Sequence, residues 1–429
     1  MSVPGWTHME CDCSIFNEYP MTTESESLKL KSLHKVLESQ DTAPLRYLVT
    51  TRSGAMNSEQ RSVIWPKLLE LDSWNPPPPV PHLKHEDHEQ ITKDIERSFV
   101  FYPKTNPDEM LRLRQRLDNL INETLCAYPG LNYYQGYHDV ASIAVLIFDD
   151  VMAYKFMTKL TLMYLRDHML PDIESTVREL KLIPELLSLV DPKLHALIGS
   201  IEPLYALSSM ISLFAHDIAD FNGLCLVWDF ILAQNSAVSA YYIYVAVLVF
   251  YKDDILNDLD DLLGKSFMSD DTLTEETELN LSDRDLIHVT LNNWISHNLK
   301  CSHLFEILKN AMRYMSDFPH ETLQTTKGLS RYSMLRASSL DPELILLHTS
   351  EQKRYLKRSR VSKALVSHHK TLSLVIKCSI GIGVAGLVLK YSLGSSGFRP
   401  RHLGVVHAAS RCISSAQGFF ETVFNGFAE

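Results

Sequence analysis

Two His-Asp doublets, His138-Asp139 and His216-Asp217, are the first candidates for chemistry in this sequence. Imidazole nitrogens and carboxylate oxygens can together hold a divalent metal ion, which can activate water for hydrolysis. The same side chains also cap helices or pair with each other inside helical domains. We favour pairing, and we keep a metal-dependent phosphohydrolase of all-α fold as the alternative.

A second candidate is the pair formed by Asp94 and Arg97 in the segment ITKDIERSF. Ile91, Ile95 and the region of Phe99 recur at helical spacing and predict a helix with one apolar face. Asp94 and Arg97 are three positions apart, so their side chains can pair on one side of that helix. By itself this pattern indicates an ordinary amphipathic helix.

A third candidate is Gln135, in the segment NYYQGYHDV. A glutamine beside a glycine, flanked by tyrosines and preceded by Pro129-Gly130, predicts a structured turn that enters a helix. Gly136 would let the backbone pass where a side chain would block a partner. We therefore expect Gln135 to be presented near the start of a helix.

The elements that must position these residues are predicted to be helices. Apolar residues between Tyr137 and Tyr251 recur every three or four positions, and few stretches alternate with period two. The helices expected in this region are Asp139–Phe148, Val151–His168, Ser175–Val190, Pro192–Ile198, Leu204–Ala219, Asn222–Gln234 and Ala237–Phe250. The fold class that follows is all-α, with many short helices packed as one domain.

Composition excludes several functional classes. The formal net charge of −11 argues against a general nucleic-acid binder. Seven scattered cysteines form no zinc pattern and favour a reducing compartment, so we expect neither a structural metal nor a disulfide scaffold. The N-terminal segment lacks a basic region followed by an apolar run, so we expect no signal peptide and a largely cytosolic chain.

The chain is predicted to divide into segments of different character. We expect a disordered N-terminus (1–25), a helical domain (26–320) with an acidic insertion (253–285), a linker with a basic juxtamembrane block (321–370), a transmembrane helix (371–394) and an amphipathic C-terminal tail (395–429).

The transmembrane prediction rests on the apolar segment Leu372–Gly394. A membrane span needs about 20 apolar residues, and this segment reaches that length if Lys377 and Lys390 extend toward the two interfaces. The adjacent basic block favours a span with its N-terminal side in the cytosol. The alternative is a buried helix of a soluble domain.

Taken in order, these motifs resemble a known family. Ile91, Asp94 and Arg97 in the pattern IxxDxxR, followed by Tyr134, Gln135 and Gly136 in the pattern YQG, resemble the paired catalytic motifs of TBC-domain Rab GTPase-activating proteins. Gly54, Arg61 and Trp65 are similar to the opening helix of that family. The segments Leu204–Phe214 and Val227–Asp229 are similar to its later helices. The resemblance covers roughly residues 45–320.

The resemblance implies a fold, a partner and site roles. It implies a multi-helix TBC domain that stimulates GTP hydrolysis on a Rab-family small GTPase in its GTP form. Arg97 would be an arginine finger and Gln135 a glutamine finger. Asp94 would hold Arg97, and Tyr134 and Gly136 would shape the loop, with Ile91, Arg61 and Trp65 in support. The chain would need no cofactor of its own, because the partner GTPase carries GTP and Mg²⁺.

The resemblance also suggests a location. Three features are similar to the endoplasmic-reticulum-anchored, single-span member of the family. They are the run of prolines after WPKLL, the sequence YYQGYHD and the C-terminal apolar segment. That similarity implies an endoplasmic reticulum membrane, with the catalytic domain facing the cytosol, and a role in early secretory traffic. The alternative from another class is a membrane-tethered TBC scaffold that binds GTPases without accelerating hydrolysis.

Overall fold

The computed structural model describes residues 22–39, 41–80, 83–263, 281–336 and 347–351. The chain divides into two units, Met1–Ser359 and Arg360–Glu429, and every described residue belongs to the first. The predicted transmembrane helix (371–394) and C-terminal tail (395–429) lie outside the described residues, as do residues 1–21 of the expected N-terminal segment and residues 264–280 of the acidic insertion.

All regular elements in the described part of the chain are helices, which confirms the predicted all-α class there. The first half contains α1 (Thr23–Leu37), α2 (Ala43–Thr50), α3 (Ser58–Leu68), α4 (His88–Glu96), α5 (Pro107–Ala127), α6 (Tyr137–Ile147), α7 (Asp150–Leu160), the π-helical turn η2 (Thr161–Leu165) and the 3₁₀ turn η3 (Arg166–Met169).

The second half contains α8 (Glu174–Leu180), α9 (Leu182–Val190), α10 (Pro192–Ile198), η4 (Pro203–Ala206), α11 (Leu207–Ile211), α12 (Phe221–Gln234), α13 (Ser239–Phe250), α14 (Lys252–Leu263), α15 (Leu281–Asn298), η5 (Cys301–His303), α16 (Leu304–Asp317), η6 (His320–Thr322) and α17 (Gln324–Gly328).

Local sequence explains where several of these helices begin. Asn57, Asn106, Asp149 and Asp220 each precede a helix and accept a hydrogen bond from a backbone N–H of its first turn. Such side chains satisfy donors that have no partner within the helix itself. The local sequence therefore determines where α3, α5, α7 and α12 begin.

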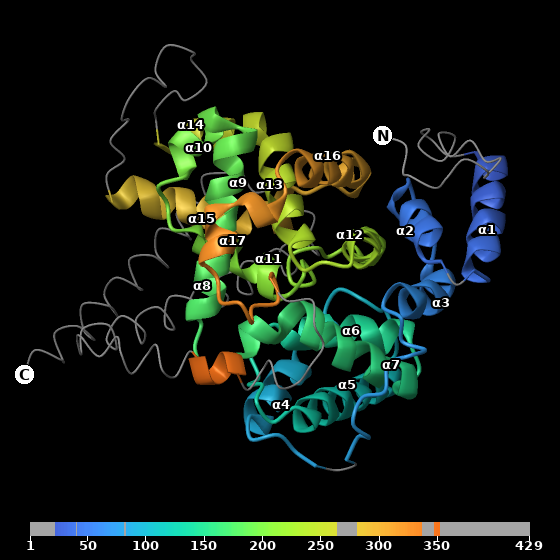
Figure 1. Cartoon of the computed structure of the whole chain (residues 1–429). Helices are drawn as coiled ribbons and strands as arrows, with labels where there is room; N and C mark the ends of the chain where they lie inside the picture. Colours follow the sequence, from blue (N-terminus) through green and yellow to red (C-terminus); the bar gives the residue numbers. More distant parts are fainter. Residues whose placement is uncertain (1–21, 40, 81–82, 264–280, 337–346, 352–429) are drawn as a thin grey trace, which may run out of the picture. The chain divides into compact units, whose positions relative to one another are not determined.

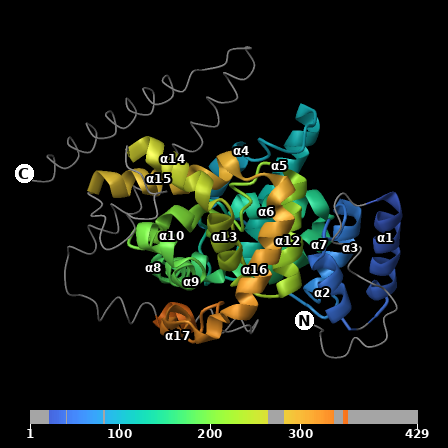
Figure 2. The same cartoon turned by 90° about the horizontal axis from the view of Figure 1, so that it is seen from above.

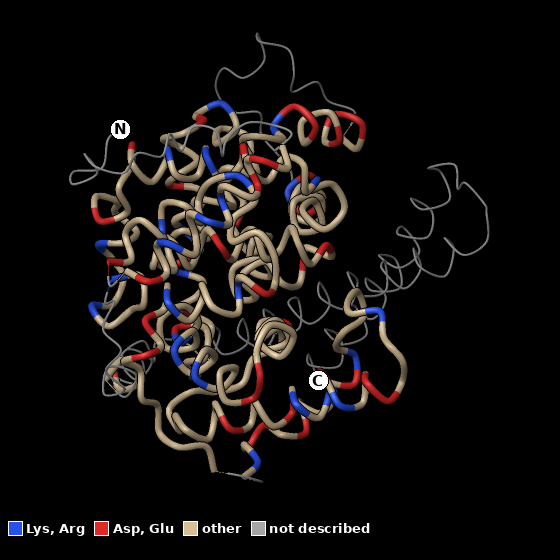
Figure 3. Tube along the Cα trace, turned by 90° about the vertical axis from the view of Figure 1, so that its right-hand side faces the viewer, with Lys and Arg blue, Asp and Glu red and all other residues tan. Residues whose placement is uncertain are grey.

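The helices gather in two groups around a shared core. In Figure 1, α4, α5, α6 and α7 lie together below α12, while α9, α10, α13 and α16 lie above it. Helix α13 is buried along most of its length and packs against α16 and α9, and α16 runs beside α12 and α13 (Figure 2). Lys and Arg positions and Asp and Glu positions are both scattered over the described chain (Figure 3).

One predicted helix is shorter than expected. We expected a continuous helix over Leu204–Ala219, but η4 and α11 end at Ile211. Leu213 and Phe214 then adopt positive φ values of 47° and 66°, which bulky residues rarely do. Asp217 accepts hydrogen bonds from Ser208 Oγ at 3.2 Å and Ser209 Oγ at 2.6 Å. These bonds fold the chain back on α11, a tertiary arrangement that apolar periodicity does not reveal.

The segment after α16 also differs from the expected linker. Residues 321–336, which the sequence assigned to a linker, pack against the domain, where Ser333, Met334 and Leu335 are buried. Helix α17 packs against α8 and α9. The acidic stretch likewise has structure at its start and end, because α14 covers Lys252–Leu263 and α15 begins at Leu281.

No single helix among the described residues has the length and apolar composition needed to cross a membrane. One pair bent by 108°, Pro192–Ile198 with Pro203–Ile211, meets those two criteria jointly.

Candidate functional site

Helix α4 places Asp94 and Arg97 at its C-terminal end. Ile91 and Ile95 are buried and fix the apolar face of the helix against the domain, as predicted. Asp94 lies on the buried side with 1% of its side chain exposed, whereas the Arg97 side chain is 40% exposed. Arg97 follows the last helical residue, so its guanidinium can reach back to Asp94 while part of it faces solvent.

The Asp94 carboxylate is the centre of the site. Its Oδ1 accepts hydrogen bonds from Arg97 Nη2 at 2.6 Å and from Gln90 Nε2 at 3.0 Å. Its Oδ2 accepts from the Tyr133 hydroxyl at 2.8 Å. A buried carboxylate is tolerated only when it is paired and hydrogen-bonded in this way. The predicted pairing of Asp94 with Arg97 is present in the structure.

The loop that carries Gln135 is tied down at several points. Asn132 donates from its backbone N–H and its side-chain amide to the Met169 carbonyl, at 2.8 and 3.0 Å. The Tyr133 N–H donates to Asp87 Oδ2 at 3.1 Å, and the Tyr134 hydroxyl donates to the Ile211 carbonyl at 2.6 Å. Gln135 itself is half-buried, and its amide has no hydrogen-bond partner within the described residues.

Gly136 is needed for its backbone conformation. It is the N-cap of α6 with φ of +114°, a region that L side chains rarely adopt. A Cβ placed there would meet Ile211 Cδ1 at 3.7 Å, which is ordinary contact. We expected the glycine to provide space, but within the chain its role is to allow the turn.

The same carboxylate therefore connects the two candidate fingers. Asp94 binds Arg97 directly, and it binds Tyr133, which lies two residues before Gln135. Arg97 and the Gln135 loop come from segments about forty residues apart and are joined by one rigid, buried group. Tyr133 was not predicted as a site residue, and only its position beside Tyr134 could have indicated it.

The two His-Asp doublets meet each other in this region. His216 Nδ1 lies 3.1 Å from Asp139 Oδ2, and His138 Nε2 lies 3.3 Å from Asp139 Oδ1. His138 also lies beside the Tyr133 hydroxyl, with Nδ1 at 3.3 Å. Among the described residues there is no group of three or more His, Cys, Asp and Glu side chains arranged to hold a metal ion. The doublets meet as hydrogen-bonded side chains, which is the interpretation that we favoured.

Burial and pairing set the charges of this cluster. Burial lowers the pKa of His138, and the charges of Asp139 and Asp94 only partly oppose it. Burial also acts to lower the pKa of His216, but the hydrogen bond and charge of Asp139 outweigh it and raise that pKa to about 9. Burial acts to raise the pKa of Asp139, yet the neighbouring His138 and His216 lower it to about 2. At neutral pH the pair is His216⁺ with Asp139⁻.

Arg61 and Trp65 take part in a different buried group. Both side chains donate to Asp229 of α12, Arg61 Nη2 at 2.9 Å and Trp65 Nε1 at 2.7 Å. The backbone N–H of Ala55 donates to the same carboxylate at 2.9 Å. Gly54 has φ of +53°, and a Cβ there would lie 2.2 Å from Asp229 Oδ2.

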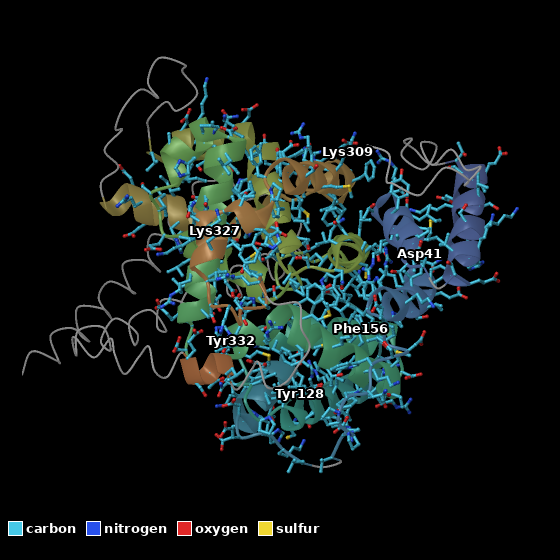
Figure 4. The ribbon with its side chains drawn as sticks, viewed as in Figure 1. Asp41, Tyr128, Phe156, Lys309, Lys327 and Tyr332 are labelled. Atoms are coloured by element: carbon cyan, nitrogen blue, oxygen red, sulfur yellow. The ribbon has the colours of Figure 1, made fainter. Side chains whose placement is uncertain are left out.

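Aromatic packing surrounds that group. The Trp65 ring stacks on Phe156 at 5.8 Å and packs against Trp228 at 5.6 Å. Phe156, labelled in Figure 4, extends from α7 into this core. Arg61 and Trp65 are thus core residues that join α3 to α12.

A family model describes much of this helical domain. Residues 58–256, which include α4, the Gln135 loop and α12, match the model of the Rab-GTPase-TBC domain. This match covers a little under half of the chain. The family expected from the sequence is the one whose model matches this segment, and every regular element described within the segment is a helix.

Individual relatives of this chain come from mammals and yeasts. TBC1 domain family member 20 of Homo sapiens is 32% identical over 241 residues, which are 54% of this chain and 59% of that protein. GTPase-activating protein gyp10 of Schizosaccharomyces pombe is 36% identical over 159 residues, 37% of this chain and 42% of that protein. GTPase-activating protein GYP8 of Saccharomyces cerevisiae is 26% identical over 396 residues, 82% of this chain and 76% of that protein. The matched region thus spans 59% of the length of the human relative.

Proposed function

We propose that this TBC-domain chain accelerates GTP hydrolysis on a Rab-family small GTPase by supplying Arg97 and Gln135 in trans. The observation that supports this most directly is the shared carboxylate of Asp94, which binds Arg97 and Tyr133 and so holds both fingers in one rigid unit. Two fungal relatives are named as GTPase-activating proteins.

The chemistry required is mainly positioning and electrostatics. Phosphoryl transfer to water spreads negative charge over the γ-phosphate oxygens, with the attacking water in line. The planar Arg97 guanidinium can donate two parallel N–H bonds to two of those oxygens in a fixed geometry, which the single ammonium of a lysine does not provide. The Gln135 amide would orient the water. The nucleotide and Mg²⁺ would both arrive with the GTPase, so this chain would contribute only side chains.

Pre-organisation favours an active protein over a scaffold. Arg97 is held by Asp94 at 2.6 Å before any partner arrives, while 40% of its side chain stays exposed. A finger that is ordered in advance loses less conformational entropy when it enters the partner's active site. A scaffold that only binds GTPases would need neither the buried carboxylate beneath Arg97 nor the anchored glutamine loop.

We also propose that the chain is anchored in a membrane. The segment 371–394 would span it, with the basic residues between Lys353 and Lys370 on the cytosolic side. We place the chain on the endoplasmic reticulum, acting on early secretory traffic with its TBC domain in the cytosol. Carbonate extraction of membranes tests the anchor, because a spanning chain stays in the pellet and a peripheral one is released.

The test of the activity is single-turnover GTP hydrolysis. Full-length chain in detergent micelles is mixed with a panel of GTP-loaded Rab proteins, with the variants Arg97→Ala and Gln135→Ala alongside. An arginine supplied in trans is worth about 10³–10⁵ in rate, so stimulation of one or a few Rabs should be lost in both variants. Arg112→Ala is the matched control, because Arg112 also forms an i,i+3 pair, with Glu109 at 3.7 Å, but is 76% exposed.

The other outcome is equally informative. If a folded chain stimulates no Rab in the panel, the activity proposal fails. Binding of GTP-loaded Rabs without stimulation would then favour the scaffold.

A further inference from the structure

His216 lies in a strained turn whose place in the fold is strongly determined. The preceding Leu213 and Phe214 have φ of 47° and 66°. The turn is held by the indole of Trp228, which donates to the Leu213 carbonyl at 2.9 Å, and by the bonds from Ser208 and Ser209 to Asp217. Backbone strain of this kind persists only where the surroundings impose it, and it concentrates at functional sites.

This turn contacts the Gln135 loop on both of its sides. Before Gln135, the Tyr134 hydroxyl donates to the Ile211 carbonyl at 2.6 Å. After Gln135, Asp139 lies in the first turn of α6, and its Oδ2 is 3.1 Å from His216 Nδ1. The N-cap residue Gly136 has no side chain to stabilise the start of that helix. The segment from Ile211 to His216 is therefore the support against which the glutamine turn rests.

Further contacts connect Asp139 with Arg97. Asp139 is 3.3 Å from His138 Nε2, and His138 Nδ1 is 3.3 Å from the Tyr133 hydroxyl. Tyr133 donates to the Asp94 carboxylate that holds Arg97. These contacts form a continuous path from His216 to Arg97 through side chains of three separate segments of the chain.

We propose that His216 is a positioning residue for both fingers. Its ring holds Asp139 at the start of α6, and it thereby fixes the positions of the Gln135 loop and of the Asp94 carboxylate that binds Arg97. This inference rests on the proposed GTPase-activating function and adds a residue to it. His216 acts through Asp139, so its loss should lower kcat and leave KM nearly unchanged.

The charge of His216 gives the proposal a second readout. The groups that face it are Asp139 and His138 of α6, its neighbour Asp217, and Arg97 after α4. The pKa of His216, about 9, keeps the ring protonated at neutral pH. Above that pKa the ion pair becomes a hydrogen bond from a neutral imidazole to the Asp139 carboxylate, which is weaker than the pair of two charged groups.

The experiment uses the full-length chain in detergent micelles with a GTP-loaded Rab that it stimulates. The variants are His216→Ala, His216→Gln and His216→Asn. Asparagine places an amide N–H near the position of Nδ1, so it can still donate to Asp139, whereas the other two cannot do so in the same place. The matched control is His297→Gln, because His297 is exposed on α15 and bonds only within that helix and to its neighbour Ser296.

We expect His216→Ala and His216→Gln to lower kcat by about 10²-fold, the size of effect that a small misplacement of catalytic groups produces. KM should stay within about two-fold, and His216→Asn should recover most of kcat. The kcat of the unsubstituted chain should fall several-fold as pH rises through about 9, relative to His216→Asn, whose amide does not titrate.

Three results would overturn the inference. One is unchanged kcat in His216→Ala and His216→Gln while Arg97→Ala abolishes stimulation. Another is a rise in KM alone, which would indicate direct contact with the GTPase. If both variants fail to fold, coincident pH profiles of the unsubstituted chain and His216→Asn overturn it. Absence of stimulation by the unsubstituted chain is a separate result, and it refutes the proposed function.

Discussion

Arg61 and Asp229 form an ion pair of 2.9 Å with almost no exposed side-chain surface, although 168 residues separate them in sequence. The pair joins α3, near the start of the domain, to α12 in its second half. Trp65 and the backbone of Ala55 use the same carboxylate. Closure of the domain therefore depends on one buried acid with several donors.

Breaking this pair should destabilise the domain strongly. Removing one partner of a buried ion pair leaves an uncompensated charge, so we expect Arg61→Ala to lower the free energy of unfolding by about 3–5 kcal/mol. Chemical denaturation followed by tryptophan fluorescence measures this. Arg178→Ala is the control, because its pair with Glu174 is exposed and should be worth about 0.2–1 kcal/mol. Equal effects of the two variants would contradict the prediction.

Replacing Asp94 by asparagine should separate positioning from folding. The amide keeps the shape of the side chain, but it cannot accept from Arg97, Gln90 and Tyr133 as a carboxylate does. We expect kcat for stimulated GTP hydrolysis to fall about 10²-fold, with KM nearly unchanged. Single-turnover rates at several concentrations of the chain give both values. A variant that keeps full kcat would show that Asp94 does not position Arg97.

Gly136→Ala should strain the glutamine loop. With φ of +114° the strain lies in the backbone, so we expect a loss of about 1–3 kcal/mol in the free energy of unfolding. Gly328→Ala is the matched control, because a Cβ there meets nothing within 4 Å and the φ is not positive. That variant should be neutral or stabilised by about 0.4–1 kcal/mol. Thermal melting of both variants checks the difference.

Removing the segment after α16 should expose a buried acid pair. Asp167 accepts from the Met334 N–H at 2.9 Å, and Glu179 accepts from Ser333 Oγ at 3.2 Å. Both carboxyls are fully buried, and burial together with Asp167 raises the pKa of Glu179. Without these partners the buried acids lose hydrogen bonds worth about 1–3 kcal/mol each.

A chain that ends at His320 should therefore melt well below one that ends at Glu351, which also keeps the contact of His348 with Asp167 at 3.4 Å. Equal melting temperatures of the two truncated chains would show that residues 321–351 contribute nothing to the stability of the domain.

The ion pair of His216 and Asp139 should also contribute to the free energy of unfolding, in a way that depends on pH. The pKa of His216 is raised from its ordinary 6.5 to about 9, so its contribution is complete below pH 6.5 and is lost as pH rises through about 9. The difference in free energy of unfolding between the unsubstituted chain and His216→Ala should shrink over that range. Denaturation at pH 6, 7.5 and 9.5 measures it. His297→Gln is measured in the same way as the control, and the same slope for both variants would contradict the assignment.

Much of the domain could be predicted from the sequence because its causes are local. Helical periodicity and capping residues such as Asn106 and Asp149 act within a few positions. They therefore specify helices independently of how the helices pack against one another. The spacing of Asp94 and Arg97 permitted their pairing for the same reason. The order of the short motifs also pointed to the TBC-domain family.

Only the tertiary structure decided how these pieces meet. The bond from Tyr133 to Asp94, the contact of His216 with Asp139 and the pairing of Arg61 with Asp229 join residues 39, 77 and 168 positions apart. No short-range pattern encodes such contacts, because they depend on the packing of whole helices. The break after Ile211 is of the same kind, since its positive φ values are imposed by packing. The candidate residues Arg97 and Gln135 could be named from the sequence, but the groups that hold their segments in place were visible only in the fold.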